Sequence, residues 1–195
     1  MDNMESRPVL NGKYVCGEWN GPVHVWRFEE RECMVLVPHR VLEDMRRMGW
    51  DALPNETGGT LVGHYSSDLR VALVERALGV RVCAQRSPVM FFRPPDDVDG
   101  QLSEIYRESG GRVYYLGEWH THPYAAPTPS VIDLNTLCDL ARAPSVATDT
   151  PIMIILGWNF VADPPGTCIL AEPSGRCLWG RYEKFPKLCS DRVPH

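Results

Sequence analysis

Apolar residues follow two different spacings along this chain. Runs rich in β-branched and apolar residues at 23–28, 33–38, 60–65 and 70–78 are typical of β-strands. The run "PIMIILGWN" at 151–159 is apolar without alternation, which indicates a strand that is buried on both faces. The pattern therefore predicts a substantial β-sheet.

Further strand signals lie in the second half of the chain. The segment "RVYYLGEWHTH" (112–122) has the composition of a strand. The segments "TCILAE" and "RCLWGRYEK" stand on either side of Pro173-Ser174-Gly175, and this turn chemistry predicts a β-hairpin.

Three segments instead repeat their apolar residues at the spacing of an amphipathic helix. They are 39–50, 100–111, which ends at a Gly-Gly pair, and 129–143. The apolar positions of the first and third are Val41, Leu42, Met45 and Met48, and Leu134, Leu137, Cys138 and Ala141.

Helices and strands interleave, which predicts an α/β fold. Hairpin signals are frequent, so we expect a mixed sheet and not a strictly parallel one. The 195 residues are enough for one domain with a full core. We expect residues 1–22 to be an N-terminal extension and residues 23–195 to form one domain that ends in the β-hairpin.

Charge and cysteine content narrow the function classes. The formal net charge is −5 and no run is rich in Lys and Arg, so we expect no nucleic-acid partner. No apolar stretch is long enough for a membrane span. The seven cysteines form no C-x-x-C pair and no signal peptide precedes them, which predicts free thiols in a reducing cytoplasm. A structural zinc site built from scattered cysteines stays open.

The stretch "YLGEWHTHPYAAPTPSVIDLNTL" (115–137) carries the candidate chemistry. His120 and His122 are two apart on a strand and point to the same face, because side chains alternate along a strand. Ser130 and Asp133 share one face of the helix that follows. The short loop between strand and helix could bring His120, His122 and Asp133 together. Three protein ligands with a fourth position open are the pattern of a catalytic zinc site.

A helix cap alone would also explain two of these residues. Ser130 followed three residues later by Asp133 matches a capping box. Thr128 with Pro129 at the first helical position is a second way to start the same helix. Trp119 lies between Glu118 and His120, so its side chain should face away from the two histidines and into the core.

The joint spacing resembles a known family. The sequence H-T-H-P, six further residues and S-x-x-D resembles the signature of the JAMM metalloproteases, also called the JAB or MPN-plus family. The segment "NETGGTLVG" places Glu56 where that family has its upstream glutamate. The resemblance covers roughly residues 33–160 and is closest to stand-alone bacterial members. It implies a curved mixed β-sheet flanked by helices, with the layering of cytidine deaminases.

The resemblance also implies a role for each motif residue. His120, His122 and Asp133 would hold one Zn²⁺ per chain, as a catalytic zinc that activates water. Glu56 would be the general acid/base. Ser130 would donate a hydrogen bond to the oxyanion. On the residues alone, Glu56 could instead be a solvated carboxylate in a loop.

The family's usual substrate is the peptide or isopeptide bond after the C-terminal glycine of a ubiquitin-like protein. The resemblance therefore implies a cytoplasmic isopeptidase with a ubiquitin-like partner. It also implies E1- or E2-like enzymes of the same operon as further partners, including those of antiphage operons. Gly58, Gly59, Phe91 and Phe92 are candidates for substrate binding. Two segments could carry specificity: 77–97, which contains the two phenylalanines, and 140–150. The two glycines could instead relieve packing, and the two phenylalanines could be core.

Three other functions are alternatives to this one. Some family members have lost their ligands and serve as non-catalytic scaffolds that bind a partner, but all five motif positions are present here. Related domains process sulfur-carrier proteins, which would keep the chemistry and change the substrate. A zinc deaminase is disfavoured, because its H-x-E and P-C-x-x-C elements are absent.

Overall fold

The computed structural model describes most of the region from Pro22 onward. The described residues are 22–79, 85–87, 90–92, 99–144, 146, 148–157, 160 and 165–185. The expected N-terminal extension therefore lies outside the described residues, apart from Pro22.

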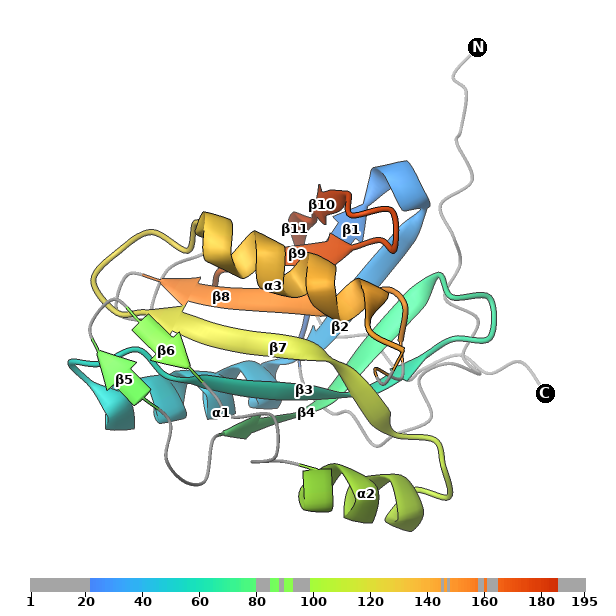
Figure 1. The fold of residues 1–195 in the computed structure, drawn as a ribbon, viewed down its shortest axis with the longest axis horizontal. Coiled ribbons are helices and arrows are strands. Elements are labelled where there is room, and N and C mark those ends of the chain that lie inside the picture. Colours follow the sequence, from blue (N-terminus) through green and yellow to red (C-terminus); the bar gives the residue numbers. More distant parts are fainter. Residues whose placement is uncertain are drawn as a thin grey trace.

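A nine-stranded sheet forms the body of the protein (Figure 1). Its strands are β1 (Val23–Phe28), β2 (Cys33–Pro38), β3 (Gly58–Tyr65), β4 (Val71–Gly79), β7 (Tyr114–His122), β8 (Ile152–Gly157), β9 (Thr167–Ala171), β10 (Cys177–Trp179) and β11 (Arg181–Phe185). A separate two-stranded sheet pairs β5 (Gln85–Ser87) with β6 (Met90–Phe92), where the sequence pattern predicts a loop.

The large sheet is mixed, as predicted. Its strand order is β10-β9-β8-β7-β3-β4-β2-β1-β11. The pairs β2–β4 and β7–β8 are parallel, and the other pairs of the large sheet are antiparallel. The predicted C-terminal hairpin is confirmed for β9 and β10, but the second half of its second arm is β11, which pairs with β1 instead.

The two edges of this sheet belong to one continuous piece of chain. β10 and β11 are separated only by Gly180, whose backbone N–H donates to the Cys168 carbonyl at 2.9 Å. β10 pairs with β9 and β11 pairs with β1, so the sheet curls until its first and last strands meet. A Cβ at Gly180 would press on Trp26 and Phe28, which fill the space inside the curl.

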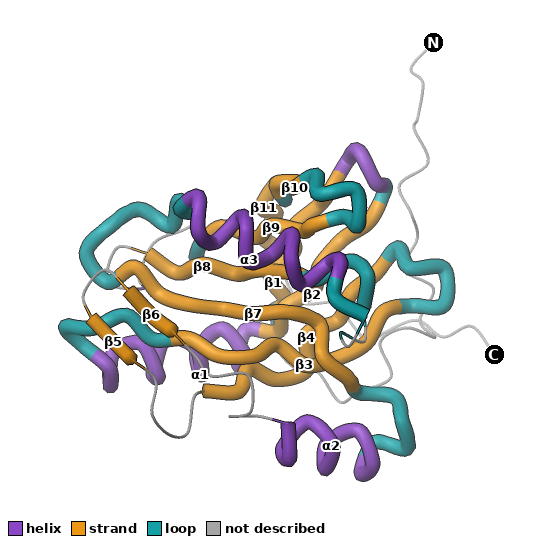
Figure 2. Tube along the Cα trace, in the orientation of Figure 1, coloured by secondary structure: helices purple, strands orange, loops and turns teal. Residues whose placement is uncertain are grey.

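Within the described ranges, three helices and one short 3₁₀ turn accompany the sheet (Figure 2). They are η1 (Glu29–Arg31), α1 (His39–Ala52), α2 (Asp99–Glu108) and α3 (Val131–Arg142). α1 and α3 lie on opposite sides of the sheet, α3 across β8 and α1 beside β3 and β4. None of the helices in the described ranges is long and apolar enough to cross a membrane.

Each face of the sheet has its own apolar cluster. Val41, Leu42 and Met45 of α1 join the inner faces of the strands in the main core, which also holds Trp26 and Trp119. Alternation along β8 divides its residues between the two faces: Ile152, Ile154 and Leu156 lie in the main core, and Met153 and Ile155 pack under α3. β8 is buried at every position, as its unbroken apolar run predicted.

The same alternation sets the orientation of β7. Trp119 is buried in the main core, where its indole N–H donates to the Leu78 carbonyl at 3.0 Å, so its predicted core role is confirmed. Gly117 allows β7 to approach β8 closely, because a Cβ there would overlap the Ile152 backbone. His120 and His122 alternate with Trp119 and Thr121 along β7, so they point toward the opposite face, which carries α3.

All cysteines in the described ranges are free thiols. Cys33 and Cys168 are buried, and Cys138 and Cys177 are partly exposed with their sulfurs 3.4 Å apart. No group of three cysteines that could hold a metal occurs among the residues the structure describes. Cys16, Cys83 and Cys189 lie outside that set.

Candidate metal centre

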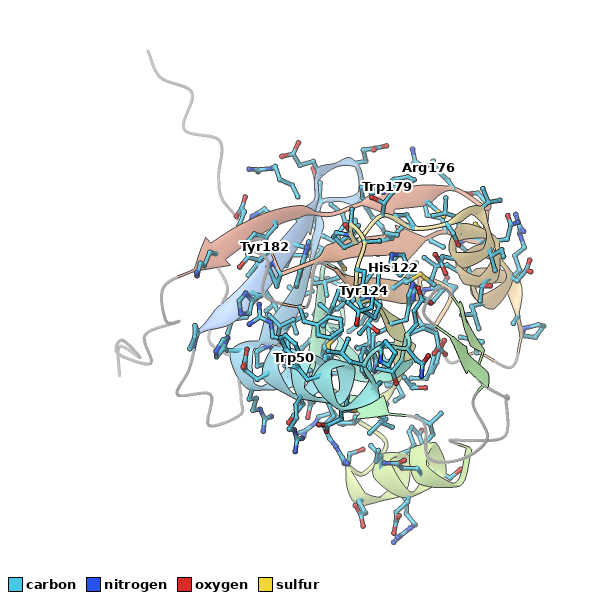
Figure 3. The ribbon with its side chains drawn as sticks, turned by 90° about the vertical axis from the view of Figure 1, so that its left-hand side faces the viewer. Trp50, His122, Tyr124, Arg176, Trp179 and Tyr182 are labelled. Atoms are coloured by element: carbon cyan, nitrogen blue, oxygen red, sulfur yellow. The ribbon has the colours of Figure 1, made fainter. Side chains whose placement is uncertain are left out.

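A cluster of metal-binding donors forms where β7 ends and α3 begins. The Nε2 atoms of His120 and His122 are 3.2 Å apart. Oδ1 of Asp133 is 3.6 Å from Nε2 of His120. One ligand atom from each of the three side chains lies within 4.8 Å of the others, which is the convergence that the spacing predicted. His122 is labelled in Figure 3, together with Tyr124, an exposed residue of the loop that follows β7.

The ring of His122 is oriented by a backbone carbonyl. Its Nδ1 lies 3.1 Å from the carbonyl oxygen of Ala126, in the loop between β7 and α3. A carbonyl can only accept, so Nδ1 carries a proton, and in the neutral form of the ring Nε2 then has the free lone pair. Such a partner behind a ligating histidine is common in metal sites. No residue pattern predicts this contact, because it uses a main-chain atom.

His120 is neutral at physiological pH. It is 7% exposed, and burial lowers its pKa to about 4. Asp133 opposes this shift and His122 adds to it. A neutral imidazole is the form that binds a metal. The nitrogen therefore needs no deprotonation at neutral pH before it can act as a ligand.

Asp133 takes part in the N-terminal cap of α3 and also points into the cluster. Its Oδ2 accepts from the Ser130 backbone N–H at 2.6 Å, and its own N–H donates to the Ser130 hydroxyl at 3.2 Å. This reciprocal pair is a capping box with Ser130 as N-cap, so the alternative start at Thr128 and Pro129 is wrong. Because the cap holds Oδ2, Oδ1 is left facing His120.

Ser130 combines exposure with a fixed position. It is exposed at the N-terminus of α3, and its oxygen is held by the Asp133 N–H. A hydroxyl that accepts through its oxygen can still donate its proton. The side chain can therefore offer one hydrogen bond to a molecule that sits over the cluster.

Glu56 stands beside the cluster, just before β3. Its Oε1 is 4.0 Å from Nε2 of His122, and the residue is only 8% exposed. Burial, with the nearby Asp133 carboxylate adding to it, raises the pKa of Glu56 to about 7. It is therefore no solvated loop carboxylate, and it can hold or release a proton near neutral pH.

This donor set fits a divalent zinc ion. Two imidazole nitrogens and one carboxylate oxygen are ligands that zinc accepts. Two lone pairs and a carboxylate facing one another repel unless a cation or a proton lies between them. Carboxyl oxygens of Asp133 and Glu56 face the Nε2 atoms of His120 and His122, and this arrangement favours a positively charged occupant.

The four suggested substrate-binding residues have different positions. Gly58 pairs with His120 across the β3–β7 ladder, so it lies directly next to the cluster. Gly59 supports the packing alternative, because a Cβ there would overlap the Leu78 carbonyl of β4. Phe91 and Phe92 form part of β6, but their side chains lie outside the described residues, as do parts of the segments 77–97 and 140–150.

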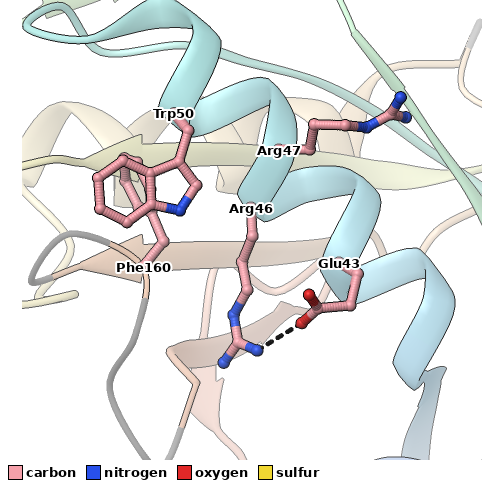
Figure 4. Close-up of a pocket in the computed structure, with 5 residues that line it drawn as sticks. All are labelled: Glu43, Arg46, Arg47, Trp50 and Phe160. Carbon is pink, nitrogen blue, oxygen red and sulfur yellow. Dashed lines mark hydrogen bonds and ion pairs between the residues drawn. The ribbon is translucent and has the colours of Figure 1, made fainter.

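A hollow on α1 shares no side chain with the cluster (Figure 4). Trp50 meets Phe160 edge-on, with ring centroids 5.6 Å apart. Arg46 pairs with Glu43 at 2.6 Å in the same hollow. The pattern of α1 predicted its buried side. Glu43, Arg46 and Trp50 lie on its opposite, at least partly exposed side, and Phe160 is a buried residue of the main core.

Comparison with known proteins gives the family. The profile described as prokaryotic homologs of the JAB domain matches residues 38–168. A protein named CD-NTase/cGAS isopeptidase from Enterobacter hormaechei is 31% identical over 137 residues, covering 70% of this chain and 72% of that protein. A probable metalloprotease from Sinorhizobium fredii is 32% identical over 126 residues, covering 63% and 75%.

Among solved structures, the solution structure of a Desulfitobacterium hafniense protein aligns with a TM-score of 0.48 at 26% identity, covering 76% of this chain and 88% of that one. The family profile spans well over half of the chain and includes each of the five motif residues. This chain therefore belongs to the prokaryotic JAB-domain family.

Proposed function

We propose that this protein is a zinc-dependent isopeptidase that cleaves after the C-terminal glycine of a ubiquitin-like protein. The convergence of His120, His122 and Asp133, with Glu56 at 4.0 Å from His122, carries the proposal. Family membership supports a hydrolase, and similar proteins are named isopeptidase and probable metalloprotease.

His120, His122 and Asp133 would hold one zinc ion per chain. Bound there, zinc would lower the pKa of a water molecule and polarise the scissile carbonyl. The three side chains are preorganised for metal binding. Burial keeps His120 neutral, the Ala126 carbonyl orients His122, and the helix cap orients Asp133.

Glu56 would act as the general acid/base. Its carboxylate would take a proton from the attacking water and pass it to the leaving nitrogen. A catalytic base works best with a pKa near the operating pH, and the buried position of Glu56 gives it that property in the metal-free protein. The side chain then acts in both halves of the reaction without moving far.

Ser130 would donate a hydrogen bond to the substrate oxygen as negative charge develops on it. The capping box fixes the hydroxyl oxygen before substrate binds, so little reorganisation is needed. Gly58, opposite His120, would leave room for the narrow Gly-Gly end of a ubiquitin-like tail.

The names of the relatives suggest what the modifier is attached to. Several similar proteins are called CD-NTase/cGAS isopeptidase. We therefore propose that the conjugate joins a ubiquitin-like protein to a nucleotidyltransferase of that class, made by E1- and E2-like enzymes in an antiphage system of the cytoplasm. Processing of a sulfur-carrier precursor would use the same residues on a different protein.

Two measurements test the proposal in order. Elemental analysis of protein purified without chelator or affinity metal should find about one zinc per chain, lost in His120→Ala. Mass spectrometry should then show cleavage after the terminal glycine of a ubiquitin-like fusion or conjugate. Glu56→Gln is the control, because it should keep zinc and lose turnover. A wild-type protein that takes up no zinc would overturn the proposal and favour the non-catalytic scaffold.

A further inference from the structure

We propose that Thr121 is the residue that positions Glu56 for catalysis. This inference rests on the proposed function of Glu56. Thr121 lies between the two histidine ligands, and alternation along β7 turns its side chain to the opposite face of the sheet. It is completely buried, so it touches neither substrate nor metal and acts only through its contacts.

Thr121 holds both backbone polar groups of Thr57, the residue that follows Glu56. The Thr57 N–H donates to the Thr121 hydroxyl oxygen at 3.0 Å. The Thr57 carbonyl accepts from the Thr121 backbone N–H at 2.8 Å and from its hydroxyl at 3.2 Å. One side chain therefore donates and accepts toward a single residue of the neighbouring segment.

This contact extends the ladder between β3 and β7 by one rung. Gly58 pairs with His120 at the last regular position of the antiparallel register. Thr57 follows opposite Thr121, and Glu56 then comes opposite His122. The register thus predicts the observed approach of Glu56 to His122, at 4.0 Å. At the Thr57–Thr121 position, the Thr121 hydroxyl oxygen accepts the hydrogen bond from the Thr57 N–H. In a regular antiparallel ladder a backbone carbonyl would accept it.

The hydroxyl is hard to replace, because both partners are buried. Thr57 is 4% exposed, so water is a poor substitute at its N–H. A buried N–H without a partner is costly, and the segment would shift to satisfy it. Glu56 is covalently next to that N–H and would move with it. A displacement of about 1 Å at a reacting group can cost about a hundredfold in rate.

The test compares Thr121→Val, which keeps the shape and removes the hydroxyl, with Thr121→Ser, which keeps the hydroxyl. Thr60→Val is the matched control: Thr60 is equally buried on β3, but its hydroxyl has no hydrogen-bond partner in the described structure. Zinc content, kcat and KM on the cleaved conjugate, and hydrogen exchange of the Thr57 amide are measured for each.

We expect Thr121→Val to bind zinc like the wild type, with kcat lowered about 10- to 100-fold and KM changed less than threefold. The Thr57 amide should exchange faster. Thr121→Ser should recover most of kcat and the amide protection, and Thr60→Val should match the wild type in all four measurements.

If Thr121→Val does not fold, Thr121→Ala is used instead, because its smaller side chain avoids any overlap. Either variant with wild-type kcat overturns the positioning role, and so does a loss of kcat that Thr121→Ser fails to recover. Failure of the proposed function looks different: the wild-type protein then cleaves no conjugate, whatever residue stands at 121.

Discussion

Ser130 should have two separable effects, one on helix stability and one on turnover. As N-cap of α3 its oxygen accepts the Asp133 N–H, and replacement of such a cap by Ala costs about 1 kcal/mol. For a chain of 195 residues this corresponds to a fall in Tm of about 2–4 °C. Replacement by Gly costs only a few tenths of a kcal/mol, because Gly is itself a fair N-cap.

Both substitutions remove the hydroxyl that would donate to the substrate oxygen. Loss of one such donor lowers kcat by about 10²–10³. We therefore expect Ser130→Ala and Ser130→Gly to be equally slow, although only the Ala variant melts clearly earlier. Ser130→Thr, which keeps the hydroxyl, should melt near the wild type and retain much of the activity.

Scanning calorimetry gives Tm and single-turnover cleavage gives the rate, both on zinc-loaded protein. The reasoning is refuted if Ser130→Gly cleaves at the wild-type rate while Ser130→Ala is slow. The hydroxyl would then matter only because it holds the first turn of α3 and, through it, Asp133.

Three further outcomes follow from the structure. Burial raises the pKa of Glu56 from 4.5 to about 7, so the folded protein binds this proton more tightly than the unfolded chain, and metal-free protein should lose stability as pH rises through that range. Glu56→Gln should therefore raise the Tm of the metal-free protein at pH 8 but not at pH 4. Equal changes in Tm at both pH values would contradict the raised pKa. Asp133→Asn and Asp133→Ala should both weaken zinc binding in a competition titration, but only the Ala variant should also lose the capping contact, so its metal-free form should melt earlier. Gly59→Ala should lower the free energy of unfolding in urea by about 1–3 kcal/mol, because its Cβ would overlap the Leu78 carbonyl, whereas Gly100→Ala, with open space around it, should not destabilise.

Local sequence patterns predicted the features that depend on local periodicity. Alternation placed His120 and His122 on one face and Trp119 on the other, and the 151–159 run predicted a fully buried strand. The S-x-x-D spacing predicted the capping box at the start of α3. In each case a few neighbouring residues determine the geometry through fixed backbone periods.

Features that depend on pairing between distant segments were not visible in the sequence. Glu56 reaches His122 because β3 and β7 pair in one particular register, and no local pattern specifies that register. Only the family resemblance pointed to Glu56. The Ala126 carbonyl behind His122 was not predicted because it is a main-chain atom. The return of β11 to β1 was not predicted because these strands are far apart in the sequence.

The curled sheet has a consequence for how the chain can be rearranged. Val23 of β1 and Phe185 of β11 stand opposite each other in the register, so the described chain begins and ends at one place. A short linker could join these two positions, and new termini could be opened in the exposed turn at Pro173 and Ser174, between β9 and β10. Such a circular permutant would keep every strand pairing, including the pair of Thr57 and Thr121 that aligns Glu56 with His122. A fusion partner would then be attached at the β9–β10 turn.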